Sequence, residues 1–223
     1  MTDGLQTAPR PFPLAVDLTG RSVRLEAVVD ERRFSELFDA LGDPAFDAIW
    51  DYMSIGPFRD RTSFETAARS LMLGEGARFF AIVPTGSGRA EGYLSLMRVD
   101  TANGVIEIGN IVLGPTLQRT RAASEAYLLV FRFVFEALGY RRLEWKCNDL
   151  NAPSKRAAER LGFSYEGLFR QHMIVKGRSR DTAWFSMLDR EWPAVRRAFE
   201  TYLDDRNFDG DGRQRHALAA RRS

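Results

Sequence analysis

Apolar positions along the chain switch repeatedly between a period of two and a helical period. Seven stretches show the alternation or the continuous apolar run that is typical of strands. The predicted strands are residues 22–26, 79–83, 91–99, 105–113, 140–147, 165–175 and 181–188. Five stretches repeat apolar residues at the three- and four-residue spacing of an amphipathic helix. The predicted helices are residues 31–41, 62–73, 122–138, 152–161 and 192–203.

These elements predict one α+β domain, built as a three-layer α/β/α sandwich around a mixed sheet of about seven strands. No internal repeat and no linker divides them. Residues 1–20 contain three prolines and few periodic apolar positions, so we expect an irregular lead-in. The domain then occupies residues 21–205. The polar residues 206–223 are expected to form a disordered, mobile tail.

Composition narrows the class of protein. Hydrophobic residues make up 44% and charged residues 28%, which suits an ordinary globular core. No apolar run approaches the roughly 18 residues that a membrane span needs, and the N-terminus does not resemble a secretion signal. One cysteine, Cys147, excludes an intrachain disulfide, and two histidines, His172 and His216, supply a metal centre poorly. We expect a cytoplasmic, metal-independent monomer or homodimer.

Arginine dominates the basic residues. Only Lys146, Lys155 and Lys176 are lysines, so 29 of the 32 basic side chains are arginine. Guanidinium groups bind phosphate bidentately, which would suit an RNA- or ribosome-associated protein. A general exchange of lysine for arginine over the surface is the favoured explanation, because the net charge is only +2 and acidic residues are interleaved throughout.

The turn at residues 117–123 joins a predicted strand to the longest predicted helix. The first turn of a helix has N–H groups without intrahelical acceptors, and the helix dipole is positive there. Such a turn is a site for a phosphate or pyrophosphate. Ala122 and Ala123 leave the backbone accessible, and Arg119 or Arg121 can add positive charge. Many helices begin this way, so the turn alone does not identify a function.

Five separated blocks carry a more specific signal. They are Glu107–Leu113, the turn at Gln118, Phe135–Leu143, Asn148–Ser154, and Arg160–Phe163 with Glu166–Gly167. In this order and spacing they resemble the GNAT acetyltransferases, and most closely the branch that includes the ribosomal-protein N-terminal (alanine/serine) acetyltransferases. The resemblance extends from about Ser22 to Trp192. It implies an acetyl-CoA-dependent N-acetyltransferase with a V-shaped splay between the fourth and fifth strands of its sheet.

The resemblance also implies a cofactor site. The family's pyrophosphate loop, Q/R-x-x-G-x-G/A, falls on Gln118–Ala123, with Arg121 in place of the central glycine. An arginine tolerates a helical backbone but not a left-handed one, so the loop amides can still face a pyrophosphate if the turn is already helical. The pantetheine arm would lie in the splay. The residues implied at the cofactor are Ile111, Val112, Leu113, Gln118, Arg119, Thr120, Arg121, Ala122, Ala123, Asn151 and Ser154.

Asn151 and Ser154 match the family's N-x-x-S at the start of the helix after the fifth strand. The asparagine resembles one that binds the pantetheine amide. The serine stands where some relatives place the proton donor to the departing thiolate, and a hydroxyl there would stabilise the developing charge. Both side chains could instead cap the helix.

The general base is left open. Some members of the branch have a glutamate on the strand after Glu166–Gly167, where this chain has Met173, which cannot accept a proton. Glu107 is the first candidate and His172 the second, either acting through water, with a purely structural role as the alternative for His172. No His–Asp pattern accompanies Cys147, so we expect direct transfer without a covalent enzyme intermediate.

An aromatic segment precedes the second predicted helix. Trp50, Tyr52 and Phe58 either line the acceptor pocket or pack the early helices. The branch includes enzymes acting on peptide N-termini and others acting on aminoacyl-nucleotides, whose bases stack on aromatic side chains. The expected acceptor is therefore a peptide N-terminus or a small aminoacyl-type amine. Self-immunity against an aminoacyl-nucleotide, or a non-catalytic acyl-CoA-binding regulator, are the alternatives.

Overall fold

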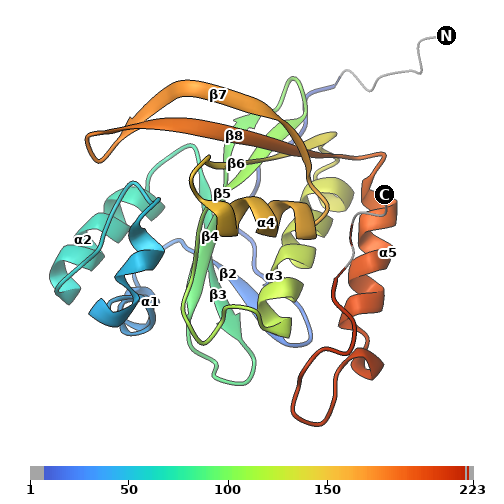
Figure 1. The fold of residues 1–223 in the computed structure, drawn as a ribbon, viewed down its shortest axis with the longest axis horizontal. Helices are drawn as coiled ribbons and strands as arrows, with labels where there is room; N and C mark the ends of the chain where they lie inside the picture. Colours follow the sequence, from blue (N-terminus) through green and yellow to red (C-terminus); the bar gives the residue numbers. More distant parts are fainter. Residues whose placement is uncertain (1–7, 219, 221–223) are drawn as a thin grey trace.

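The computed structural model describes residues 8–218 and 220, and an eight-stranded sheet runs through its centre (Figure 1). The strand order is β1-β2-β3-β4-β5-β6-β8-β7. β5 and β6 are parallel, and all other neighbours are antiparallel, which confirms the mixed sheet. The strands are β1 Leu18–Thr19, β2 Val23–Ala27, β3 Arg78–Pro84, β4 Gly92–Asp100, β5 Val105–Leu113, β6 Arg142–Asn148, β7 Ser164–Val175 and β8 Arg178–Leu188. The short β1 lies in the stretch that was expected to be irregular.

Helices cover both faces of the sheet and complete the predicted three layers. α1 and α2 lie on one side, and α3 and α5 lie on the other (Figure 1). The α-helices are α1 Phe34–Leu41, α2 Arg61–Met72, α3 Arg121–Arg132, α4 Ala152–Arg160 and α5 Trp192–Leu203. Short helical turns are η1 Pro44–Trp50, η2 Phe133–Ala137 and η3 Asp205–Asn207. The long predicted helix 122–138 is therefore α3 continued by the π-helical turn η2.

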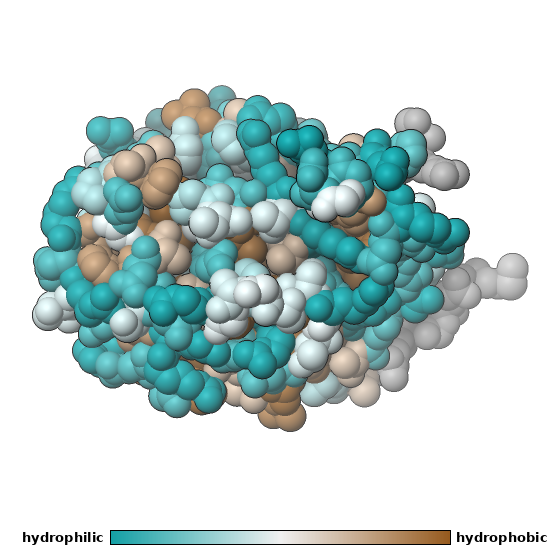
Figure 2. Space-filling model, turned by 90° about the horizontal axis from the view of Figure 1, so that it is seen from below, coloured by the Kyte–Doolittle hydropathy of each residue, from teal (hydrophilic) through white to brown (hydrophobic). Residues whose placement is uncertain are grey.

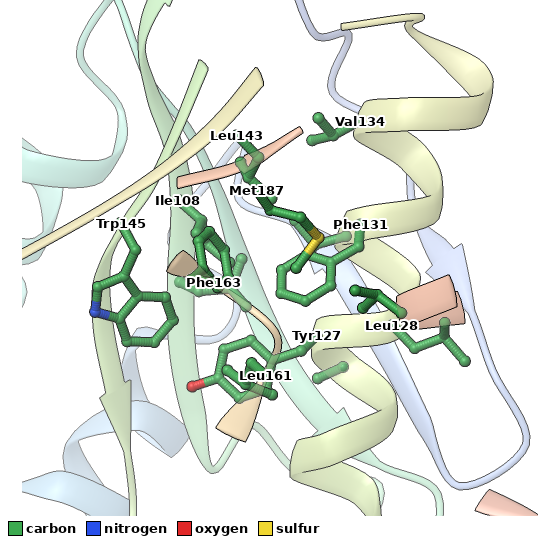
Figure 3. Packing of buried hydrophobic residues seen from close by; sticks show 14 of the residues in the cluster. Ile108, Tyr127, Leu128, Phe131, Val134, Leu143, Trp145, Leu161, Phe163 and Met187 are labelled. Carbon is green, nitrogen blue, oxygen red and sulfur yellow. The ribbon is translucent and has the colours of Figure 1, made fainter. Parts of the chain in front are cut away.

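Two apolar clusters hold the layers together. In the larger one, Phe131 of α3 packs edge-on against Phe163 at 5.6 Å and against Phe199 of α5 at 5.8 Å between ring centres. Tyr127, one turn earlier, packs against Trp145 of β6, so α3 is fixed to the strand beside it (Figure 3). Burying each such ring contributes roughly 1.5–3 kcal/mol. The smaller cluster joins α1, α2 and the segment 50–58 to the opposite face.

The expected splay lies between β5 and β6. Their pairing ends at Glu107 opposite Glu144, although β5 continues to Leu113 and β6 to Asn148. β5 bends there because a bulge at Asn110 shifts its register with β4, and Asn110 adopts a left-handed φ of 49°. Gly109 lies beside the bulge, where a Cβ would be 2.8 Å from Met97 Sδ and would require the Met97 side chain to move. The chain thus opens its own sheet at a defined residue.

The segment after α5 differs from the expected mobile tail. The Asn207 side chain donates to the Tyr202 carbonyl at 2.8 Å and accepts from the His216 amide at 2.9 Å. Leu218 is 5% exposed and packs in the larger cluster. Side-chain bonds to backbone groups thus fold residues 207–218 back toward α5, although this polar segment has no apolar period. Residues 219 and 221–223 lie outside the described part of the chain.

Candidate active site

The turn before α3 presents backbone N–H groups at the end of β5. Thr120 caps the helix by accepting from the Ala123 amide at 3.1 Å, which leaves the first-turn amides of Arg121 and Ala122 without an intrahelical acceptor. Arg119 just before the cap has a left-handed φ of 62° and is exposed. The side chain of Ala123 is buried, so only its backbone belongs to the turn's surface. The turn thus presents two free amides at the start of α3, and anion binding there stays a prediction.

Arg121 does not point into this turn. Its guanidinium donates to the Leu203 carbonyl and to Asp205 Oδ1, and it lies over the ring of Phe208. Its backbone is already helical because it is the first residue of α3. An arginine therefore replaces the loop glycine without strain, and its side chain holds the C-terminal segment instead.

The open side of β5 suits an extended ligand with amide groups. Beyond Glu107 the strand has no backbone partner on its β6 side. The side chain of Val112 is buried in the smaller cluster and that of Ile111 packs at the edge of the larger one, so the backbone of these residues is what the splay presents. Gln118 closes the far end by donating to the Leu113 carbonyl at 2.9 Å. The strand thus presents unpaired backbone groups next to the first turn of α3.

Across the splay, the start of α4 positions Asn151 and Ser154. Asn151 is the helix cap and accepts from the Ser154 amide at 3.0 Å, so the capping interpretation holds for the asparagine. The Ser154 hydroxyl accepts from Trp145 Nε1 at 3.0 Å and also forms a side-chain hydrogen bond with the Cys147 thiol. Burial raises the pKa of the neighbouring Cys147 thiol, which disfavours a thiolate nucleophile.

Glu107 lies in a buried cluster of charges where the splay begins. It is 3% exposed, and its carboxylate accepts from Arg98 at 2.8 Å and pairs with Lys146 Nζ at 3.0 Å. Lys146 also pairs with Glu144 at 2.8 Å and lies 3.8 Å from the centre of the Trp184 ring. A base has to accept a proton, and on Glu107 that would break the ion pairs with Arg98 and Lys146. These contacts therefore argue against Glu107 as the general base.

His172 stands at the edge of a cavity of about 970 Å³ between the β6–α4 turn and β7. A register shift in β7 turns it there, and the Gln171 amide fixes that bend by donating to Asp181 Oδ1 at 2.6 Å. His172 Nδ1 lies 3.0 Å from the buried Thr182 hydroxyl, which orients the ring. The cavity lining comprises Asn148, Asp149, Leu150, Phe169, Arg170, Gln171, His172, Ser179 and Asp181.

The aromatic segment divides between packing and the cavity. Trp50 is 1% and Phe58 8% exposed, and their rings meet edge-on at 5.2 Å. For these two residues the pocket-lining interpretation is wrong and the packing interpretation holds. The Tyr52 hydroxyl instead donates to the Leu150 carbonyl at 3.1 Å, at the cavity wall. Lys176, at the tip of the β7–β8 hairpin, donates to the Trp50 carbonyl and fixes the hairpin over this segment.

Sequence reasoning did not single out the charged residues beside Glu107. Arg98, Lys146 and Arg180 come together only through the pairing of β4, β5, β6 and β8. One available signal was that Lys146 alternates with the buried Trp145 and Cys147 in a strand, which directs it to the opposite face. A second signal was that Lys146 is one of only three lysines in a chain rich in arginine.

The hydropathy of the surface and of the helices bears on whether the chain could cross a membrane. The face seen in Figure 2 is mainly hydrophilic, with hydrophobic residues scattered among polar ones. In the described part of the chain, no helix is both long and apolar enough to cross a membrane. Across residues 8–218 and 220, no group of three or more His, Cys, Asp or Glu side chains is arranged to hold a metal ion.

Comparison with known proteins identifies the class to which this fold and site belong. The model of the acetyltransferase (GNAT) domain matches residues 23–164, so the chain belongs to the GNAT acetyltransferases and is an acetyltransferase. The crystal structure of a GCN5-related N-acetyltransferase from Brucella melitensis is 46% identical, covers 96% of each chain and has a TM-score of 0.93. The uncharacterized N-acetyltransferase p20 of Bacillus licheniformis is 33% identical over 147 residues, which are 65% of this chain and 82% of that protein.

The charge cluster predicts a stability effect. Replacing Glu107 with Gln leaves Lys146 paired with Glu144 alone. Removing one partner of a buried pair costs roughly 3–5 kcal/mol, and the remaining pair with Glu144 makes this an upper bound. We expect a loss of this order in the free energy of unfolding measured by denaturant titration. Glu159→Gln, on the exposed face of α4, should change it by less than about 0.5 kcal/mol. A Glu107→Gln variant as stable as the parent would show that the carboxylate is free for another role.

Proposed function

We propose that this acetyltransferase moves an acetyl group from acetyl-CoA directly to the primary amine of a peptide N-terminus or a small aminoacyl-type acceptor. The observation that supports it most is the splay after Glu107, which is flanked by the α3 turn on one side and by the Ser154 hydroxyl on the other. Its direct test is thiol release from acetyl-CoA across a screen of N-terminal peptides, aminoacyl adenylates and small amines. Binding without turnover on any acceptor would contradict it.

In this proposal the backbone of Ile111–Leu113 binds the pantetheine amides, and the free amides of the α3 turn bind the pyrophosphate. Arg121, which stands in place of the central glycine of the family's pyrophosphate loop, would be a reason to favour a non-catalytic acyl-CoA-binding protein. That reason weakens because the Arg121 side chain is directed to Asp205, away from the loop. Assignment to the ribosomal-protein N-terminal acetyltransferase branch belongs to the same proposal and depends on the acceptor screen.

The chemistry needs two proton transfers. As the amine nitrogen bonds to the thioester carbonyl carbon and the C–S bond breaks, Ser154 donates its hydroxyl proton to the leaving sulfur and regains one from solvent. The proton lost by the amine goes to His172, directly or through a water in the cavity. We propose His172 in this role ahead of Glu107, because the carboxylate of Glu107 is bonded to Arg98 and Lys146. Glu107 then positions those two cations.

The cofactor turn can be tested with one added carboxylate. Ala122→Asp places a negative charge at the second residue of α3, where an acidic side chain suits the helix dipole and folding is preserved. The same charge repels a pyrophosphate, so we expect acetyl-CoA affinity to fall at least tenfold in calorimetric titration, or about 1.4 kcal/mol. Thr62→Asp makes the same change at the second residue of α2 and should leave affinity unchanged. Equal affinity in both variants would exclude this placement of the pyrophosphate.

Ser154→Ala tests the proton donor. General acid catalysis contributes roughly 10²–10⁴-fold, so kcat should fall within that range while acetyl-CoA affinity stays nearly constant. Asn151, not Ser154, caps α4, but Ser154→Ala leaves the buried Trp145 Nε1 without an acceptor. We therefore expect a loss of about 1–3 kcal/mol in the free energy of unfolding, and kcat is measured at a temperature where the variant is folded. Ser70→Ala, an exposed serine on α2, is the matched control. Normal turnover in Ser154→Ala would remove the serine from the mechanism.

His172→Gln tests the base while keeping a side chain that can bond to Thr182. We expect kcat/KM to fall at least tenfold below pH 8, where an α-amino group with a pKa of about 7.7–8.0 is largely protonated. The deficit should shrink at higher pH because the neutral amine then needs no base. His216→Gln, in the C-terminal segment, should retain the parent profile in the same pH–rate measurement. A pH-independent loss in His172→Gln would indicate a structural role.

A further inference from the structure

One cation in the site has no partner. The side chain of Arg180 makes no ion pair and no hydrogen bond with any described residue, and its Nε is buried. Burial lowers the pKa of this guanidinium, and its electrostatic neighbours are Cys147 of β6, Glu107 of β5 and Arg98 of β4. Arg180 is only partly exposed, and burying part of a cation without an acid beside it is costly.

The surrounding charges do not balance it. The connected ion pairs near Arg180 join the cations Arg98, Lys146 and Arg142 to three glutamates, and these charges cancel. The three glutamates are Glu107, Glu144 and Glu166. Arg180 is therefore outside this network of ion pairs and has no acid as a partner within it.

A second unpaired donor lies on the same strand. Alternate residues of β8 face the same side of the sheet, which places Trp184 on the side of Arg180 and Thr182. Trp184 Nε1 is buried and has no hydrogen-bond partner among the described residues. Ser179 and Asp181, which flank Arg180, line the cavity beside His172. Arg180 itself is not part of the cavity lining. Its Nε and Trp184 Nε1 are two donors without a partner on the face of β8 that carries Thr182, the hydrogen-bond partner of His172.

We propose that Arg180 binds an anionic group, a carboxylate or a phosphate, carried by the amine acceptor close to its amino group. The planar guanidinium matches either anion bidentately, and the bound anion supplies the missing negative charge. Trp184 Nε1 is the second donor of this subsite. The inference rests on the proposed function, because it assigns the acceptor class of the same site.

Anion binding can be tested before any acceptor is known. With the protein saturated with CoA, so that the pyrophosphate turn is filled, inorganic phosphate is titrated and the melting temperature recorded. We expect phosphate to raise the Tm of the parent protein and of Arg178→Gln, an exposed arginine two residues earlier on β8, but not of Arg180→Gln. Arg180→Met should raise the Tm without phosphate, because it removes an unpaired buried charge. An equal phosphate response in Arg180→Gln would overturn the proposal.

Kinetics distinguish the acceptor's anion from a general effect on turnover. Two matched pairs of acceptor amines are compared. Phosphoethanolamine and ethanolamine differ by a phosphate, and an α-amino acid and its amide differ by a carboxylate. Arg180→Gln should raise KM at least tenfold for the anionic member of the preferred pair and leave the neutral member unchanged. An equal loss for both members, or a parent enzyme that prefers the neutral amines, would overturn the inference. Turnover of neutral amines alone would still support the proposed function, so the two failures are distinguishable.

Discussion

The architecture of the site depends on one constraint, which is that β5 and β6 stop pairing after Glu107 and Glu144. Gly109 and the bulge at Asn110 turn β5 away, and no neighbouring strand satisfies the groups thus released. Unpaired backbone groups in a sheet are costly unless water or a ligand binds them. In the proposed function the splay therefore binds the amide groups of the cofactor, and the α3 turn at its end binds the pyrophosphate without any special side chain.

A sheet opened at its centre needs support from both sides. On one face the aromatic contacts of Phe131, Tyr127 and Trp145 fix α3 to β6. On the other face the ion pairs of Glu107 with Arg98 and Lys146 tie β4, β5 and β6 together just before the strands part. The same cluster stabilises the splay and shapes the electrostatics of the site.

Most of the fold could be predicted from local pattern. The period-two stretches became strands, and helix 192–203 was predicted with the bounds that the structure shows. Local pattern failed where long-range contacts decide. Trp50 and Phe58 are core residues although their segment resembles a pocket wall, and the polar residues after α5 are ordered by Asn207. Arg180 could not be found either, because its lack of a partner is a property of four strands brought together.

The replacement of the loop glycine by Arg121 shows how sequence and structure differ as evidence. In a motif, an arginine at that position suggests a weakened cofactor site. In the fold, the residue begins a helix whose backbone needs no glycine, and its side chain is bonded to Leu203 and Asp205. The substitution thus acts on the C-terminal segment, which it holds against α3, and leaves the amides of the turn available. A residue that differs from a motif changes function only where its side chain blocks the ligand. In the proposed site the ligand contacts the backbone amides of the turn, and the Arg121 side chain is directed away from them.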